Sequence, residues 1–122
     1  MKYDVDYILD EKLRLEIGML KNFISEILKE SKIYLFGSIA KGNYNKNSDI
    51  DLLVLIEDDK SLKELREMRH FVEDSIEELN LNHNVDIKLY SKERYFSLAS
   101  YPSFEGGIMK DLIDLGGWNY GK

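Results

Sequence analysis

The sequence contains no cysteine, which excludes disulfide bonds and thiolate-ligated metal sites. Proline occurs once in 122 residues, and no apolar run approaches the roughly 18 residues that a membrane-spanning helix requires. The first residues, from Met1 to Asp6, lack the long apolar stretch of a secretory signal peptide. These absences predict a cytoplasmic protein that does not associate with membranes.

Basic residues are also in short supply, because 17 Lys and Arg oppose 23 Asp and Glu and the formal net charge is −6. Nucleic-acid backbones are bound mainly through Lys and Arg, so direct binding of DNA or RNA is not expected. A small nucleotide neutralised by metal ions, or a basic protein partner, is easier to accommodate on an acidic surface.

The sequence does have the apolar pattern of a single α/β (α+β) domain over residues 1–122, with 43% hydrophobic residues. The apolar positions of a first helix recur at steps of four and three: Leu13, Ile17, Leu20, Ile24 and Ile27. This spacing predicts a helix over residues 10–29. A second helix is predicted over 61–79, where Ser61 and Glu64 form a capping box. His70 and His83 show no ligand spacing and are expected at the surface.

Three short apolar segments predict strands over residues 33–36, 49–56 and 84–90. The second should be central in the sheet, because both of its faces are apolar after Asp51. After Ser91 the apolar pattern weakens. We expect a short helix over 92–98 and a last helix carrying Ile108, Leu112 and Leu115, which ends at Gly116 and Gly117. Trp118 and Tyr120 should form a short terminal strand or pack on the core.

Polar residues cluster where the first two strands meet a glycine-containing loop. Gly37 and Ser38 close the first strand, and Asp49 and Asp51 open the second. Alternate residues of a strand share a face, so the two carboxylates should project to the same side, where they suit a hard cation such as Mg²⁺. Gly37 allows close approach of the backbone, and Ser38 offers a hydroxyl and an N–H to a phosphate. This pattern indicates a site for a metal-bound nucleoside triphosphate.

Asp86 stands in the middle of the third strand, where an aspartate is unfavourable by propensity. Val85, Ile87 and Leu89 should face one way, and Asp86 the other together with Lys88. A third metal-binding carboxylate is one explanation for Asp86. The alternative is an aspartate on an edge strand that lies in water or pairs with Lys88.

The motif Gly-Ser-x-Ala-x-Gly, followed after five residues by Ser-Asp-Ile-Asp-Leu, resembles the signature of the DNA polymerase beta-type nucleotidyltransferases. The fuller form is similar to the minimal nucleotidyltransferase (MNT) branch, which includes antitoxins. The matching residues are Gly37, Ser38, Ala40, Gly42, Ser48, Asp49, Ile50, Asp51 and Leu52. Ile39 departs from the basic or polar residue of many relatives, so a phosphate contact from that side chain is missing.

The resemblance implies a nucleotidyltransferase fold, with a small mixed sheet and helices packed on it. It implies two Mg²⁺ ions, with Mn²⁺ as an alternative. Asp49 and Asp51 would serve the triphosphate, and Asp51 together with Asp86 would serve the acceptor hydroxyl. Gly37 and Ser38 would bind phosphates, and Ser48 belongs to the matched motif. Lys41 or Lys46 would add a point charge, although a solvated loop lysine is the alternative.

The activity implied by the resemblance is transfer of AMP from ATP, or of another NMP from its NTP, to a hydroxyl, with release of pyrophosphate. In this family a stand-alone MNT protein is often encoded beside a HEPN-type toxin and acts as its antitoxin, by binding the toxin or by adenylylating it. Two other interpretations stay open: a non-catalytic antitoxin that neutralises its partner by contact, and a homodimeric small-molecule nucleotidyltransferase. The sequence fixes neither the acceptor, nor the preferred base, nor the oligomeric state.

Overall fold

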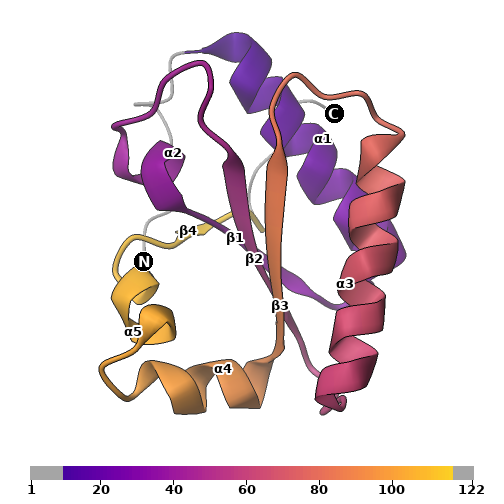
Figure 1. Ribbon diagram of the computed structural model, residues 1–122, viewed down its shortest axis with the longest axis vertical. Coiled ribbons are helices and arrows are strands. Elements are labelled where there is room, and N and C mark those ends of the chain that lie inside the picture. Colours follow the sequence, from indigo (N-terminus) through magenta and orange to yellow (C-terminus); the bar gives the residue numbers. More distant parts are fainter. Residues whose placement is uncertain (1–9, 117–122) are drawn as a thin grey trace.

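The computed structural model describes residues 10–116 of the chain, and the expectation for Trp118 and Tyr120 lies outside the described residues. Helices and strands alternate through most of the described part (Figure 1). In chain order they are α1 (Glu11–Ile27), β1 (Lys32–Phe36), α2 (Gly37–Lys41), β2 (Ile50–Ile56), α3 (Leu62–Glu77), β3 (Val85–Ser91), α4 (Lys92–Ala99), α5 (Phe104–Met109) and β4 (Ile113–Asp114). The structure confirms three of the predicted helices and all three predicted strands, with each end within two residues of its predicted place. The confirmed helices are those predicted over 10–29, 61–79 and 92–98.

The four strands form one mixed sheet in the order β3-β2-β1-β4. β1 pairs antiparallel with β2 and with β4, whereas β2 pairs parallel with β3. The parallel pair needs a crossover connection, which α3 provides. β2 therefore lies between β1 and β3, as its apolar faces predicted, and β3 forms an edge of the sheet.

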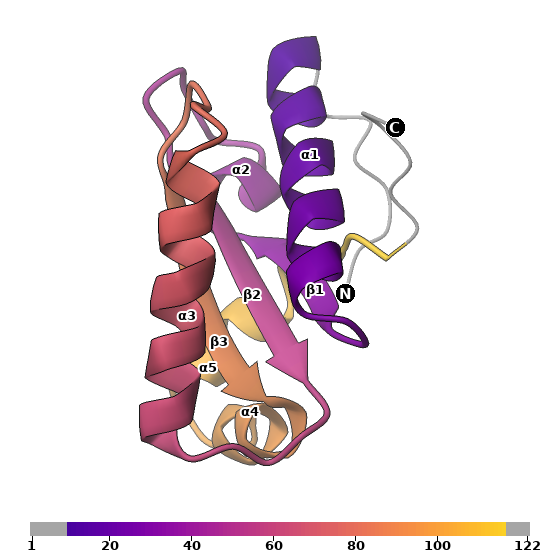
Figure 2. The same cartoon turned by 90° about the vertical axis from the view of Figure 1, so that its right-hand side faces the viewer.

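Helices α1 and α3 cover one face of the sheet, and Figure 2 views the molecule from this side. The apolar stripe of α1 predicted from the sequence is buried here against inward-facing strand residues and part of α3. Both helices begin with side-chain caps: Asp10 accepts N–H groups of α1, and the predicted capping box of Ser61 and Glu64 opens α3. No helix among residues 10–116 is both long and apolar enough to cross a membrane.

The opposite face of the sheet is partly covered by α4 and α5, which lie toward one end of the strands (Figure 1). Tyr95 is completely buried there, and its hydroxyl donates a 2.8 Å hydrogen bond to the carbonyl of Glu105. The hydroxyl of Tyr90 on β3 donates to the Glu105 carboxylate at 2.7 Å. These hydrogen bonds attach α4 and α5 to the C-terminal end of β3. The N-terminal ends of β2 and β3 lie away from these two helices (Figure 1).

The last helix predicted from the sequence is wrong. Ser103 caps α5 with a hydrogen bond from the N–H of Gly106, so Gly106 and Gly107 lie inside a short helix. The helix ends at Met109, and Ile113 then pairs with Leu35 of β1 as part of β4. The apolar side chains of this segment are buried by strand pairing, which overrides their helix-like spacing.

The expectation that His83 lies at the surface is also wrong. Its ring Nδ1 lies 3.3 Å from Oε2 of Glu16, and both side chains are less than one tenth exposed. Oε1 of Glu16 accepts the backbone N–H groups of Asn82 and His83 at 2.7 and 3.3 Å. A carboxylate on α1 thus holds the loop between α3 and β3, and this loop leads directly to Asp86.

Candidate active site

Gly37 occupies a backbone position that only glycine fits well. Its φ is +80°, in the left-handed region, where β1 turns into α2. A Cβ added at this position would overlap Oδ2 of Asp51 and lie 2.9 Å from its Cγ. The turn therefore presents bare backbone to the Asp51 carboxylate, and the half-buried Ser38 follows in the first turn of α2.

The loop between α2 and β2 delivers Asp49 to the start of β2. Gly42 ends α2 with φ +83°. Ser48 then closes a turn, because its hydroxyl accepts the N–H of Asn45 at 2.9 Å and its own N–H donates to the Asn45 carbonyl at 3.0 Å. Ser48 thereby fixes the loop just before Asp49, and the predicted contact of Ser48 with nucleotide stays a prediction.

Asp51 and Asp86 come together because β2 and β3 pair in parallel with these residues as register partners. Asp51 is also the register partner of Phe36 on β1, immediately before Gly37. Neighbouring strands lie about 4.8 Å apart, so the two carboxylates leave adjacent strands on the same face. The structure thus places the three predicted segments, around Gly37, Asp51 and Asp86, at one end of the sheet.

Electrostatics links the three carboxylates. The pKa of Asp51 is raised to about 6, first by burial and then by the negative charges of Asp86 and Asp49, while the positive charge of Lys88 acts against the rise. A carboxylate that is half-buried beside two others is harder to ionise. The three carboxylates therefore repel one another when no cation is bound.

Lys88 holds Asp86 in the described structure. Its Nζ lies 3.5 Å from Oδ2 of Asp86, and both side chains are more than one third exposed. This contact is the alternative that the sequence left open for Asp86, and β3 is an edge strand as that alternative required. An exposed ion pair contributes little to stability, so Asp86 can leave Lys88 at small cost.

The donor set fits a hard divalent cation, although the side chains are not closed around one. Oxygen ligands from carboxylates are what Mg²⁺ and Mn²⁺ prefer, and a cation would relieve the repulsion that raises the pKa of Asp51. Within residues 10–116, no three His, Cys, Asp or Glu side chains converge tightly enough to hold an ion as they stand. The carboxylates must draw closer together to hold an ion.

The two lysines that the sequence suggests as phosphate contacts, Lys41 and Lys46, lie at the exposed surface. Lys41 ends α2, Lys46 lies in the following loop, and both side chains are exposed. Neither is placed in contact with the carboxylates, so a role toward phosphate stays a prediction for Lys41. Sequence reasoning gave Lys88 no role beyond pairing, although its position two residues after Asp86 already put both on one face.

Comparison with known proteins identifies the family of the chain. A family model described as "Nucleotidyltransferase domain" matches residues 17–114. That range holds most of the chain and all of the candidate site, and the chain belongs to the nucleotidyltransferase-domain family. Its mixed sheet with packed helices is the nucleotidyltransferase fold that the sequence predicted.

One relative matches over a short stretch of the chain, and two solved structures match over most of the chain at low sequence identity. The chain is 43% identical over 53 residues to a candidate protein adenylyltransferase of Methanocaldococcus jannaschii, with 39% of this chain and 54% of that protein covered. The chain thus spans about half the length of this relative. A crystal structure of a candidate nucleotidyltransferase from Sulfolobus solfataricus is 21% identical, with a TM-score of 0.48 over 87% of this chain and 86% of that one. A crystal structure of a toxin-antitoxin with AMP-PNP is 24% identical, with a TM-score of 0.42 over 70% and 67%.

Proposed function

We propose that this chain is a metal-dependent nucleotidyltransferase that moves AMP from ATP to a hydroxyl group of a partner protein. The observation that carries the proposal is the register pairing of Asp51 with Asp86, beside the Gly37 turn and close enough to Asp49 for its charge to act on Asp51. Membership of the nucleotidyltransferase-domain family supports the reaction class. The name of the Methanocaldococcus jannaschii relative supports a protein as acceptor.

In this proposal the residues divide into a nucleotide side and an acceptor side. The bare backbone at Gly37 and the hydroxyl of Ser38 bind the triphosphate, and Asp49 with Asp51 orients it. Asp86 lies on the acceptor side, where it positions the hydroxyl and receives its proton. The acceptor oxygen bonds to the α-phosphorus as the bond to the bridging oxygen breaks, and pyrophosphate leaves. Mg²⁺ or Mn²⁺ held by Asp49, Asp51 and Asp86 would supply electrostatic stabilisation of the charge that develops on phosphate oxygens.

The partner in this proposal is a HEPN-type toxin, the partner class that the family resemblance implies. The transfer would neutralise it by modifying a tyrosine, serine or threonine. The net charge of −6 supports a basic or neutral protein as acceptor over a polyanion.

Intact mass of a co-expressed partner tests the proposal. With ATP and Mg²⁺ we expect a gain of about 329 Da per modified site, as expected for transfer of one AMP. Asp49→Asn and Asp51→Asn should abolish the gain, whereas Asp58→Asn, an exposed carboxylate beyond the end of β2, should leave it intact. A partner mass that never changes with the wild-type chain would contradict the proposal.

The second candidate is a non-catalytic antitoxin that neutralises its partner by contact. Two observations favour it: the ion pair of Asp86 with Lys88, and the open arrangement of the carboxylates within residues 10–116. The mass experiment separates the two candidates. A silenced partner in a tight complex, with unchanged mass and with the same silencing by Asp51→Asn, would establish neutralisation by contact.

A further inference from the structure

A hollow of about 260 Å³ lies where α3, β3 and α4 meet. α3 projects beyond the free edge of β3 (Figure 2) and forms one wall of this hollow, and α4 contributes from the other face of the sheet. The charged residues that line it are all basic, and we call it the basic hollow. They are Arg66, Arg69, Lys88 and Arg94.

The charges of the basic hollow are poorly neutralised, although the chain as a whole has a net charge of −6. Within residues 10–116 the structure gives no ion pair for Arg66 or Arg94. Nε of Arg69 lies 3.9 Å from Oε1 of Glu73, but this Nε atom is buried and has no hydrogen-bond partner among the described residues. Cations that three elements bring together repel one another unless negative charge lies among them. The basic hollow therefore suits an anionic ligand.

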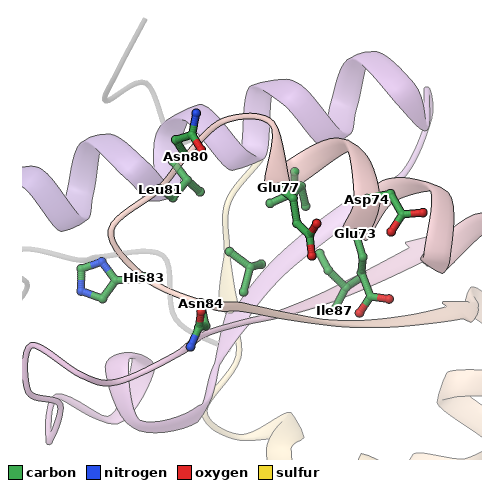
Figure 3. A pocket seen from close by; sticks show the side chains of 10 residues that line it. Glu73, Asp74, Glu77, Asn80, Leu81, His83, Asn84 and Ile87 are labelled. Atoms are coloured by element: carbon green, nitrogen blue, oxygen red, sulfur yellow. The ribbon is translucent and has the colours of Figure 1, made fainter.

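The surface next to the basic hollow has the opposite charge. Beside the N-terminal end of β3 lies a second hollow of about 620 Å³, and its charged lining includes Glu73, Asp74 and Glu77 from the C-terminal half of α3 (Figure 3). An anion is repelled from this acidic hollow and attracted to the basic one. A ligand with its negative charge confined to a short stretch therefore fits this edge better than a nucleic acid, which carries charge along its whole length.

The size and the apolar part of the lining favour a protein segment over a free nucleotide. Sites for small molecules measure roughly 300–1,000 Å³, which is more than the basic hollow offers. Leu62, which is 56% exposed, and Leu89 add apolar surface to the lining. Arginine pairs well with carboxylates, and exposed leucine gains from covering by another apolar side chain. This chemistry fits an extended segment that carries both acidic and apolar residues.

Lys88 places the basic hollow beside the candidate active site. Lys88 lines the hollow, and its Nζ lies 3.5 Å from Oδ2 of Asp86. In the proposed function Asp86 serves the acceptor hydroxyl. Gly37, which would bind the triphosphate, follows β1 on the other side of β2. A segment in the basic hollow therefore approaches from the acceptor side and leaves the nucleotide side free.

We propose that the basic hollow binds an acidic segment of the partner protein and thereby brings a hydroxyl of that protein to the Asp86 side of the site. This inference rests on the proposed function and adds the chemistry by which the acceptor is recognised. The rest of the partner can be basic or neutral, because the surface around the basic hollow is acidic.

Binding of a synthetic peptide tests the basic hollow without ATP. The probe is the peptide Glu-Glu-Leu-Glu-Glu-Tyr, titrated into the full chain and followed by NMR. We expect shifts of the amide signals of Arg66, Lys88 and Arg94, and a dissociation constant that increases with salt. Arg66→Ala and Arg94→Ala should each weaken binding about threefold, and the double variant about tenfold. Lys63→Ala is the matched control, since Lys63 is exposed on α3 and does not line the hollow.

The kinetics of transfer to the co-expressed partner connect the basic hollow with the acceptor. The double variant of Arg66 and Arg94 should raise the KM for the partner about tenfold and leave kcat within about twofold, because docking acts equally on the ground state and the transition state. Affinity for ATP should not change. If the wild-type chain never transfers AMP, the proposed function fails, and the peptide titration still tests the basic hollow because it needs no nucleotide.

Three results would overturn the proposal. The first is a peptide that does not bind the wild-type chain, or that binds the double variant equally well. The second is an unchanged KM for the partner in the double variant. The third is a single-stranded RNA oligonucleotide, or inorganic pyrophosphate, that binds the basic hollow more tightly than the peptide, which would assign the hollow to a nucleic acid or to a free phosphate compound.

Discussion

Gly37 and Asp51 lie so close across the end of β1 and β2 that the Asp51 carboxylate takes the space of the side chain that Gly37 lacks. The positive φ of Gly37 and the position of the carboxylate are thus two parts of one contact. A phosphate that binds to the Gly37 backbone would therefore lie next to the Asp51 carboxylate. The contact explains why a glycine and an aspartate, separated by a whole loop, belong to one motif.

Gly37→Ala should therefore damage both stability and activity. The new methyl group overlaps Asp51, and the left-handed backbone becomes strained, so we expect a loss of about 1–3 kcal/mol in the free energy of unfolding. Transfer should fall about 10²-fold, because Asp51 is displaced. Gly107→Ala is the matched control: a Cβ there meets nothing within 4 Å, and its stability should change little. Thermal unfolding and a transfer assay measure the two effects.

Asp86→Asn should lower transfer by about 10²- to 10⁴-fold and leave the fold intact, because a neutral amide neither binds a cation well nor receives a proton. Nucleotide binding should largely survive, since we assign Asp49 and Asp51 to the nucleotide. Asp49→Asn should lose binding as well as transfer. Calorimetry with ATP and Mg²⁺, beside the transfer assay, separates these outcomes. Normal transfer by Asp86→Asn would make Asp86 a structural residue of β3.

ATP binding should need a divalent cation. Three nearby carboxylates repel a triphosphate at short range unless positive charge lies between them. Calorimetric titration in Mg²⁺ should give clear binding, and the same titration in EDTA should give none. Equal affinity under both conditions would contradict the metal-dependent mechanism.

The pKa of Asp51, raised to about 6 from 3.8, predicts how stability depends on pH in EDTA. The unfolded chain ionises Asp51 more readily than the folded chain does. The contribution of Asp51 to stability is therefore fully present below about pH 3.8 and is lost as the pH rises through about 6. Other carboxylates act in the opposite direction, so the useful quantity is the difference in unfolding free energy between wild type and Asp51→Asn. As the pH rises, the unfolding free energy of the wild type should fall relative to that of Asp51→Asn, and Mg²⁺ should reverse this trend.

Glu16→Ala should destabilise the protein by about 1–3 kcal/mol, because it leaves the N–H groups of Asn82 and His83 without their carboxylate acceptor. Glu26→Ala, an exposed residue of the same helix, is the control. Denaturant unfolding followed by circular dichroism measures both variants. Equal stability of the two would show that the buried carboxylate contributes nothing net.

Much of the fold follows from the sequence, because local patterns and tertiary packing agree in most segments. The apolar steps of α1, the capping box at Ser61 and the alternation around Asp86 each specify their element. The failure lies at residues 104–115, where pairing of Ile113 with β1 decides the structure. A pairing between distant segments leaves no local signal, so helical spacing was a misleading guide there.

The candidate site was predictable to the extent that strand alternation and motif spacing fix it. Gly37, Asp49, Asp51 and Asp86 could be chosen from the sequence, but the register that makes Asp51 and Asp86 neighbours could not. Burial of Asp51, which raises its pKa, depends on packing from several elements. The buried pair of Glu16 and His83 was missed for the same reason, since two isolated residues give no pattern until the chain folds.

The parallel pairing of β2 with β3 also has a consequence for the order of folding. β1, the Gly37 turn and β2 are close in sequence, so the contact of Gly37 with Asp51 closes a short loop. Asp86 reaches Asp51 only across the α3 crossover, which closes a longer loop at a greater entropic cost. We therefore expect the carboxylate cluster to be completed late in folding, so a cation that binds all three carboxylates should slow unfolding more than it speeds folding.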